Sequence, residues 1–146
     1  MMTARDILAA KGSAVWSVHP GATVFDALKL MSEREVGAVI VLDETEEVRG
    51  ILSERDYARK IPLQGKLSRE TVVAEIMTPV ERMHTVTPSS TLEECMVLMT
   101  AKHVRHLPVF EASRFVGLIS IGDVVKATIS EKQHLIDQLR DYIARA

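Results

Sequence analysis

The stretch GILSERDYARK, residues 50–60, has a counterpart later in the chain, GLISIGDVVK, residues 117–126. Each contains a glycine, a short apolar run, a serine and, three residues after the serine, an aspartate. The serines are Ser53 and Ser120, and the aspartates are Asp56 and Asp123. Repetition at a fixed spacing indicates an internal repeat, which constrains the fold more strongly than any single motif.

The similarity extends upstream of both stretches. With a shift of 68 residues, seven positions before Gly50 match positions before Gly117. The pairs are Val18 with Val86, Pro20 with Pro88, Thr23 with Thr91, Leu30 with Leu98, Met31 with Met99, Val36 with Val104 and Val41 with Val109. A copy of about 45 residues is too small to bury its own apolar face, so we expect the two copies to pack on each other.

Each copy shows the same order of predicted elements. Thr23 and Asp26 form a helix-capping pattern ahead of apolar residues at helical spacing, and Thr91 and Glu94 repeat it. Two β-branched runs separated by a polar turn follow in each copy, which predicts two strands and a tight connection. The sequence therefore predicts an α/β (α+β) fold of tandem β-α-β-β-α repeats, packed as a pseudo-two-fold pair.

The breakers and caps predict four segments. The repeats are expected at 15–61 and 83–129, with a linker at 62–82 that contains a short helix near residues 71–76. A capping box at Ser130 and Gln133 predicts a separate amphipathic helix over 130–146. Its apolar residues near one face are Leu135, Leu139, Tyr142 and Ile143. That face either packs back on its own domain or forms a homodimer, and the pattern does not decide between the two.

Composition excludes several classes of function. The formal net charge is -2 and no basic block is present, which argues against nucleic-acid binding. No secretory signal and no long uncharged apolar run is found, which predicts a cytoplasmic protein without a membrane partner. The single cysteine, Cys95, excludes an internal disulfide and is interpreted as a small buried residue rather than a redox sensor.

Catalytic and metal-binding motifs are also missing from the sequence. It has no glycine-rich phosphate loop, no Gly-x-Ser-x-Gly and no His-Glu-x-x-His. The five histidines are dispersed, and only His103 and His106 are close in sequence. We therefore expect neither an enzyme with catalytic residues nor a metal site.

The doubled unit resembles a tandem cystathionine β-synthase (CBS) domain pair over residues 15–128. The resemblance rests on the repeated Gly-apolar-apolar-Ser-x-x-Asp motif, on MTP at 77–79 and on HVRHLPVF at 103–110. It implies a regulatory module that binds adenosine nucleotides in clefts between the repeats. AMP is the first candidate, with ATP or NAD(H) as others. The alternative is a ligand-independent interaction module. The resemblance also implies a homodimer and leaves the regulated protein unidentified.

The Ser-x-x-Asp motif has two interpretations. As a capping box, the serine accepts from the helix backbone and the aspartate complements the helix dipole. As a ligand site, the helix N-terminus offers N–H groups to a phosphate, and an ionised carboxylate suits the two ribose hydroxyls. The resemblance assigns ribose to Asp56 and Asp123, and phosphate to Ser53 and Ser120.

Other candidates surround these motifs. The resemblance implies an apolar wall for the base near the start of each copy, with Trp16, Val18, His84 and Val86 as its residues. Phosphate contacts are expected from His103, Arg105 and His106 in the second copy, where the first copy has Glu35, Gly37 and Ala38. Arg55, Arg59 and Lys126 are further cationic candidates. The two sites are therefore predicted to differ in charge.

Overall fold

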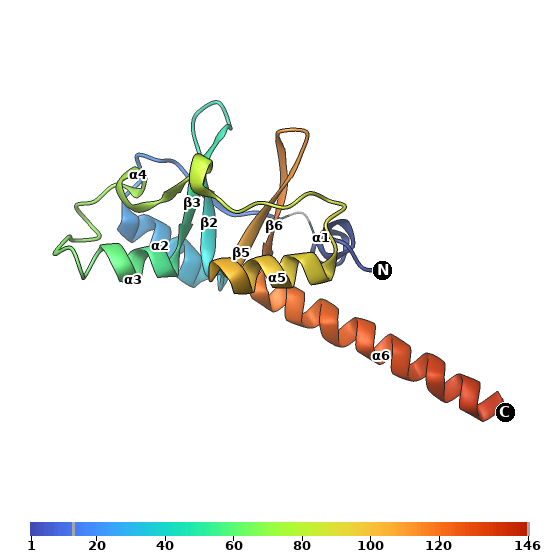
Figure 1. Ribbon diagram of the computed structural model, residues 1–146. Helices are drawn as coiled ribbons and strands as arrows, with labels where there is room; N and C mark the ends of the chain where they lie inside the picture. The colour runs from blue at the N-terminus through green and yellow to red at the C-terminus, as the bar shows by residue number, and fades with distance from the viewer. Residues whose placement is uncertain (13, 146) are drawn as a thin grey trace. The chain divides into compact units, whose positions relative to one another are not determined.

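The computed structural model describes residues 1–12 and 14–145. The chain divides into two compact units, and most of their elements are labelled in Figure 1. One unit comprises residues 14–83, and the other combines residues 1–13 with 84–146. The first repeat lies in one unit and the second repeat in the other.

The unit of residues 14–83 is built on a four-stranded sheet in the order β1-β2-β3-β4. Strand β1 pairs in parallel with β2, and the other two pairings are antiparallel. The strands are β1 (Ser17–Val18), β2 (Ala38–Leu42), β3 (Val48–Ser53) and β4 (Thr78–Pro79). The helices are α2 (Val24–Arg34), α3 (Glu54–Lys60), α4 (Val73–Ile76) and the 3-10 turn η1 (Val80–Arg82). Apolar residues of β2, β3, α2 and α4 form its core.

The other unit contains a two-stranded antiparallel sheet. Its elements are α1 (Ala4–Lys11), α5 (Leu92–Lys102), β5 (His106–Glu111), β6 (Arg114–Ser120) and α6 (Ile121–Arg145). In place of β1, the second repeat has a single parallel bridge between Val86 and Val109. The predicted order of elements is therefore confirmed in both copies, with this first strand reduced to one bridge.

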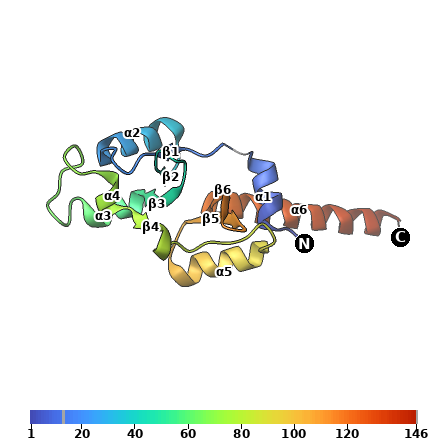
Figure 2. The same ribbon diagram turned by 90° about the horizontal axis from the view of Figure 1, so that it is seen from above.

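Each repeat packs with a segment that lies outside it in the sequence. The N-terminal segment packs with the second repeat, and the linker segment packs with the first. The N-terminal helix α1 lies against β6 and α6 of the second repeat (Figure 2). In the same way, the segment containing α4 pairs with the first repeat, through a bridge between Thr23 and Val72. A bridge between Thr3 and Thr91 is its counterpart. The exchange gives each small repeat the apolar cover that it lacks alone.

Helix α1 was not predicted, although its signals are present. Thr3 and Asp6 form a capping box at its start, and Gly12 follows its last residue with a φ of 91°. This is the Thr-x-x-Asp pattern that marks α2, followed by the glycine that commonly ends a helix. Application of the same rule to the first residues identifies the helix.

The predicted C-terminal helix is confirmed, but its predicted start at Ser130 is wrong. Helix α6 runs without interruption from Ile121 to Arg145, so Ser130 lies in its interior. No proline or glycine follows Gly122 in this segment, and the Ser130–Gln133 pattern alone does not break a helix whose backbone bonds continue through it. The boundaries of the predicted repeats remain a prediction.

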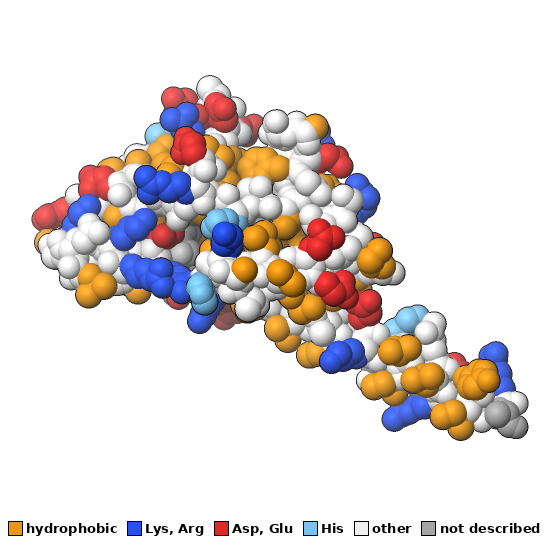
Figure 3. Space-filling view, in the orientation of Figure 1, with side chains coloured by type: hydrophobic (Ala, Val, Ile, Leu, Met, Phe, Trp, Pro, Cys, Tyr) orange, Lys and Arg blue, Asp and Glu red, His pale blue; other side chains and the backbone are white. Residues whose placement is uncertain are grey.

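The second half of α6 does not pack back on its own unit. Every residue from 132 to 145 is exposed. Figure 3 shows hydrophobic side chains gathered along this half of the helix. The exposed apolar residues on α6 are Ile121, Val125, Ile129, Leu135, Ile136, Leu139, Tyr142 and Ile143. Within residues 1–12 and 14–145, no helix combines the length and apolarity needed to cross a bilayer.

Candidate functional site

Both Ser-x-x-Asp motifs lie where a strand passes directly into a helix. Ser53 ends β3 and Ser120 ends β6. Ser53 Oγ accepts from Asp56 N at 3.1 Å, and Ser120 Oγ accepts from Asp123 N at 3.2 Å. In return, Asp56 Oδ2 and Asp123 Oδ2 accept from the serine backbone N–H groups at 3.0 and 2.8 Å. The capping interpretation is therefore confirmed at both positions.

The two carboxylates differ in their remaining partners. Asp56 Oδ2 also accepts from Ser53 Oγ at 3.1 Å, and its Oδ1 accepts from Thr78 Oγ1 at 3.2 Å. Lys60 Nζ lies 3.6 Å from the same Oδ1 and donates to Ile76 O at 2.8 Å. Both oxygens of Asp56 are thus engaged by groups of its own unit.

Asp123 is paired with Lys11 of the N-terminal helix. Lys11 Nζ lies 2.7 Å from Asp123 Oδ2 and donates to Leu118 O, also at 2.7 Å. Among the residues that the structure describes, none donates to Asp123 Oδ1. Burial alone raises the pKa of Asp123, but the hydrogen bonds from Lys11 and Ser120 and the charge of Lys11 outweigh it and lower the pKa. Asp123 therefore combines a full negative charge with one oxygen still able to accept.

His106 lies beside this group because β5 pairs His106 with Ser120 of β6. Burial, the Lys11 charge and the Arg105 charge lower the pKa of His106 to about 4, against an opposing effect of Asp123. The imidazole is consequently neutral at pH 7. The positive charge that the sequence analysis expected from His106 is absent at neutral pH, and Lys11 supplies a cation there instead.

The lowered pKa of His106 predicts a loss of stability in mild acid. Between pH 6.5 and pH 4 the unfolded chain takes up a proton that the folded chain excludes, so acidification favours unfolding. From pH 7 to pH 5 we expect this group to cost about 1 to 2 kcal/mol of unfolding free energy. Urea denaturation at both pH values measures it. His106→Gln should lose less unfolding free energy than the wild type between pH 7 and pH 5. An equal loss in the two proteins would contradict the low pKa of His106.

The other cationic candidates are spread around the same strand and helix ends. His103 is the C-cap of α5, with a φ of 54°. Glu35 is the equivalent residue of the first repeat and caps α2 with the same φ. Arg105 is exposed, and its carbonyl accepts from Ile121 N at 2.8 Å, which places its backbone at the start of α6. Arg55 lies half-buried on α3, in the other unit.

The residues proposed as a base wall are mainly part of the cores. Val86 is 8% exposed and packs in the core of its unit. Val18 and Trp16 are half-buried against the core of the other unit, and the Arg34 guanidinium lies 4.1 Å from the centroid of the Trp16 ring. His84 is half-buried. The structure thus brings Ser120, Asp123, His106 and Arg105 together in one unit, and Ser53 with Asp56 in the other.

Three residues beside the carboxylates were missed in the sequence analysis: Lys11, Lys60 and Thr78. Lys60 follows Asp56 by four residues on a predicted helix, a spacing that brings opposite charges together and identifies it directly. Lys11 and Thr78 reach their carboxylates from segments distant in sequence, so no local pattern identifies them.

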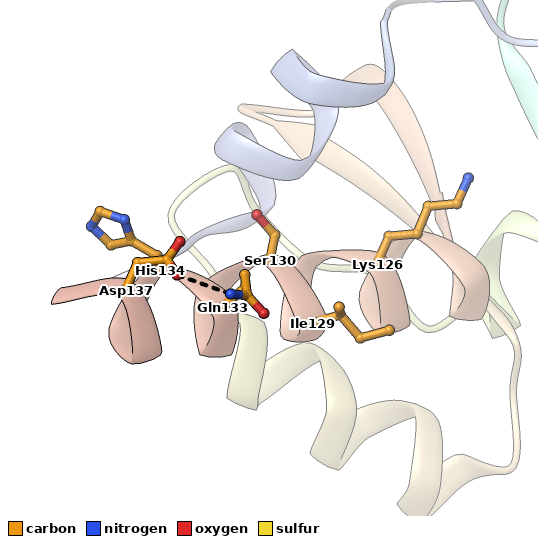
Figure 4. A pocket seen from close by; sticks show the side chains of 6 residues that line it. All are labelled: Lys126, Ile129, Ser130, Gln133, His134 and Asp137. Atoms are coloured by element: carbon orange, nitrogen blue, oxygen red, sulfur yellow. Dashed lines mark hydrogen bonds between the residues drawn. The ribbon is translucent and has the colours of Figure 1, made fainter. Parts of the chain in front are cut away.

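Surface hollows lie elsewhere on the units. One runs along α6 between Lys126 and Asp137, where Gln133 Nε2 donates to Asp137 Oδ1 at 3.0 Å (Figure 4). Another lies at the end of α2, bordered by Glu35, Gly37 and Glu54. Neither includes an aspartate of the two motifs. In residues 1–12 and 14–145, no three metal-ligating side chains come together.

Cys95 lies on α5 and is buried in the core of its unit, and burial raises the pKa of its thiol. A protonated, enclosed thiol is a poor nucleophile. Its interpretation as a small core residue is confirmed.

Comparison with protein families gives a match to the CBS domain over residues 4–63 and again over 73–130. Among curated proteins, the chain is similar to the mitochondrial CBS domain-containing protein CBSX3 of Arabidopsis thaliana, with 41% identity over 136 residues. That alignment covers 92% of this chain and 66% of CBSX3, so the chain spans just under two thirds of that relative.

Solved structures give the same fold. A CBS-domain protein from Burkholderia ambifaria MC40-6 superposes with a TM-score of 0.83 and 45% identity, over 88% of this chain and 95% of that one. CBSX2, solved in complex with AMP, superposes with a TM-score of 0.72 over 89% of this chain and 98% of its own. At 24% identity, the CBSX2 comparison bears on the fold alone.

Proposed function

The chain belongs to the CBS-domain family and carries two CBS domains, and from this premise we propose that it is a regulatory module that binds an adenosine nucleotide. AMP is the first candidate, ahead of ATP and NAD(H). The ligand binds at the strand–helix junctions, where the Ser-x-x-Asp motifs also cap the helices. The protein acts by changing its shape or its affinity for a partner rather than by catalysis. The protein that this module regulates is unidentified.

The observation that carries this proposal is the state of Asp123. Its carboxylate is ionised and retains an oxygen with acceptor capacity, and it lies at the first turn of a long helix. A ribose hydroxyl is a donor that such an oxygen accepts, and the N–H groups of the first helical turn suit a phosphate. CBSX2 is a protein of the same fold whose structure is an AMP complex.

The other candidate residues are assigned to the phosphate or to the weaker first site. Ser120 and Arg105 meet the phosphate, with His103 nearby and with His106 present as a neutral imidazole at pH 7. In the first repeat, Ser53, Asp56 and Arg55 form the weaker site, because both Asp56 oxygens already have partners. Val18 in the first repeat, and His84 and Val86 in the second, are the candidates for contact with the base of their own site. No metal takes part.

A thermal-shift panel tests the proposal against a ligand-independent interaction module. A ligand that prefers the folded state raises the melting temperature by an amount that grows with its concentration above Kd. AMP, ATP and NAD(H) are compared with inorganic phosphate as the control. A shift with an adenosine compound and none with phosphate supports the proposal; a flat response to every compound favours the interaction module.

We also propose that the chain forms a homodimer in which the second half of α6 contributes to the interface. Leu135, Ile136, Leu139, Tyr142 and Ile143 lie along this half and are 43% to 75% exposed. Residues 130–145 carry three acidic and three basic side chains, so two copies meet without net repulsion. Such a stripe is stable in water when a second copy covers it.

Leu139→Asp tests this interface. A charge in the centre of the stripe should shift the protein toward monomer, with a dimer dissociation constant raised about tenfold or more, because a buried unpaired carboxylate is strongly disfavoured. Light scattering after gel filtration measures the mass. Ser130→Asp adds the same charge on the opposite face and should leave the dimer intact. A wild-type monomer at micromolar concentration contradicts the proposal.

The cytoplasmic location predicted from the sequence is retained as part of this proposal. CBSX3 is a mitochondrial protein by its name. Fluorescence microscopy of the tagged chain in its native cell distinguishes the two locations.

A further inference from the structure

We propose that Lys11 is an internal competitor for the Asp123 carboxylate, which an adenosine ligand has to displace; this rests on the function proposed above. Lys11 Nζ donates to Asp123 Oδ2 and to Leu118 O, each at 2.7 Å. Both acceptors lie at the junction of β6 and α6. The ammonium therefore occupies the place that a donor from the ligand requires.

Lys11 is delivered by a docked element and not by a loose tail. Ala4 N donates to Ser90 O at 2.8 Å, and Leu92 N donates to Met2 O at 3.0 Å. Further along α1, the Leu8 side chain packs so closely on Gly117 that a Cβ there would come within 2.7 Å of it. These contacts fix the last residue of α1 beside Asp123.

The acceptor capacity of Asp123 explains why Lys11 competes. Oδ2 already receives two donors, Ser120 N at 2.8 Å and Lys11 Nζ at 2.7 Å. Of the described residues, none donates to Oδ1. A ribose diol offers two donors, and a carboxylate holds them best with one oxygen for each. With Lys11 in place, the diol has access to one oxygen only.

This restraint is specific to the second repeat. Asp56 has a lysine from its own helix, Lys60, at the longer distance of 3.6 Å, and a neutral hydroxyl from Thr78 at 3.2 Å. The Lys11 and Asp123 side chains are 31% and 14% exposed, so water screens their attraction only in part. The N-terminal helix thereby sets the affinity of the second site and leaves that of the first unchanged.

The test is calorimetric titration of adenosine into the wild-type protein and Lys11→Met. Adenosine is used because it has both ribose hydroxyls and no phosphate. Loss of an attraction between Lys11 and a phosphate therefore cannot change the measured affinity. Removal of the competitor should raise adenosine affinity about fivefold, the order of an ion pair between partly exposed groups. For 2′-deoxyadenosine, which has one hydroxyl of the pair, the gain should be smaller.

Two further variants serve as controls. Lys132→Met removes an exposed lysine from the second half of α6 and should leave adenosine affinity unchanged. Lys11→Gln removes the charge with a polar side chain and should reproduce the gain of Lys11→Met if the latter folds poorly.

The outcomes separate this inference from the proposed function. Binding of adenosine with equal or lower affinity in both Lys11 variants overturns the competitor role and leaves nucleotide binding intact. Binding by the variants where the wild type shows none supports the competitor role. If neither adenosine nor AMP binds to any of these proteins, the proposed function fails, and the role of Lys11 fails with it.

Discussion

Gly50→Ala should destabilise the unit of residues 14–83 by about 3 kcal/mol, because the new methyl group meets backbone atoms that cannot give way. Gly50 is buried in β3 and pairs with Pro79 of β4. A Cβ on Gly50 would collide with the carbonyl oxygen of Thr78 and lie 3.2 Å from Pro79 Cα. Both neighbours belong to the linker strand that completes the first repeat.

Gly117→Ala is the matched control, since Gly117 is the equivalent residue of the second repeat. Its Cβ would come within 2.7 Å of the end of the Leu8 side chain. A leucine terminus can change rotamer, so the expected loss is smaller, about 1 kcal/mol. Urea denaturation of both variants at pH 7 measures the difference. A larger loss in Gly117→Ala than in Gly50→Ala contradicts the close backbone contact between β3 and β4.

Asp123→Ala should weaken binding of AMP by about 1 to 3 kcal/mol, which corresponds to about 5- to 150-fold in Kd, because it removes a charged acceptor from the ribose. Asp56→Ala should have a smaller effect, since Asp56 has partners for both oxygens before any ligand arrives. Isothermal titration calorimetry of each variant against the wild type provides both values.

Both substitutions also remove a helix cap, which costs about 1 kcal/mol of stability. Circular dichroism and a melting curve must therefore show that each variant is folded at the temperature of the titration. Ser89→Ala, at an exposed position of the second repeat, serves as a substitution remote from both caps. Wild-type affinity in both aspartate variants would leave the two motifs as caps alone.

The repeat made most of the fold predictable. Two copies in register, each with its own caps and apolar periodicity, identify the elements from Thr23 to Lys60 and from Thr91 to the end of β6. Local chemistry that recurs after 67 or 68 residues is the signature of an internal repeat. The same caps confirm that Ser53 and Ser120 begin helices.

The exchange of segments between repeats was beyond the sequence. Helix α1 could be predicted as a helix from Thr3 and Gly12, but nothing in its own residues states that it docks on the second repeat. Its position depends on small residues at distant points, such as Gly117 under Leu8. The predicted helix start at Ser130 fails for the opposite reason, because a local capping signal was given more weight than the continuous helical run around it.

In the candidate site too, local features were predictable from the sequence and contacts between distant segments were not. The caps and the presence of a carboxylate were predictable, because both lie within four residues. The difference between the two carboxylates was expected from His103, Arg105 and His106, yet it resides largely in Lys11, more than 100 residues away in sequence. The neutral state of His106 also follows from burial, which a sequence pattern does not specify.

A two-dimensional NMR titration of isotope-labelled protein with AMP tests the central claim most directly, because backbone amide signals locate the ligand without any substitution. We predict saturable shifts at Leu118, Ser120 and Asp123, at the junction of β6 and α6, together with a shift at Lys11. No shift at millimolar AMP, or shifts confined to residues 130–145 of α6, would contradict the proposal that Asp123 belongs to a nucleotide site.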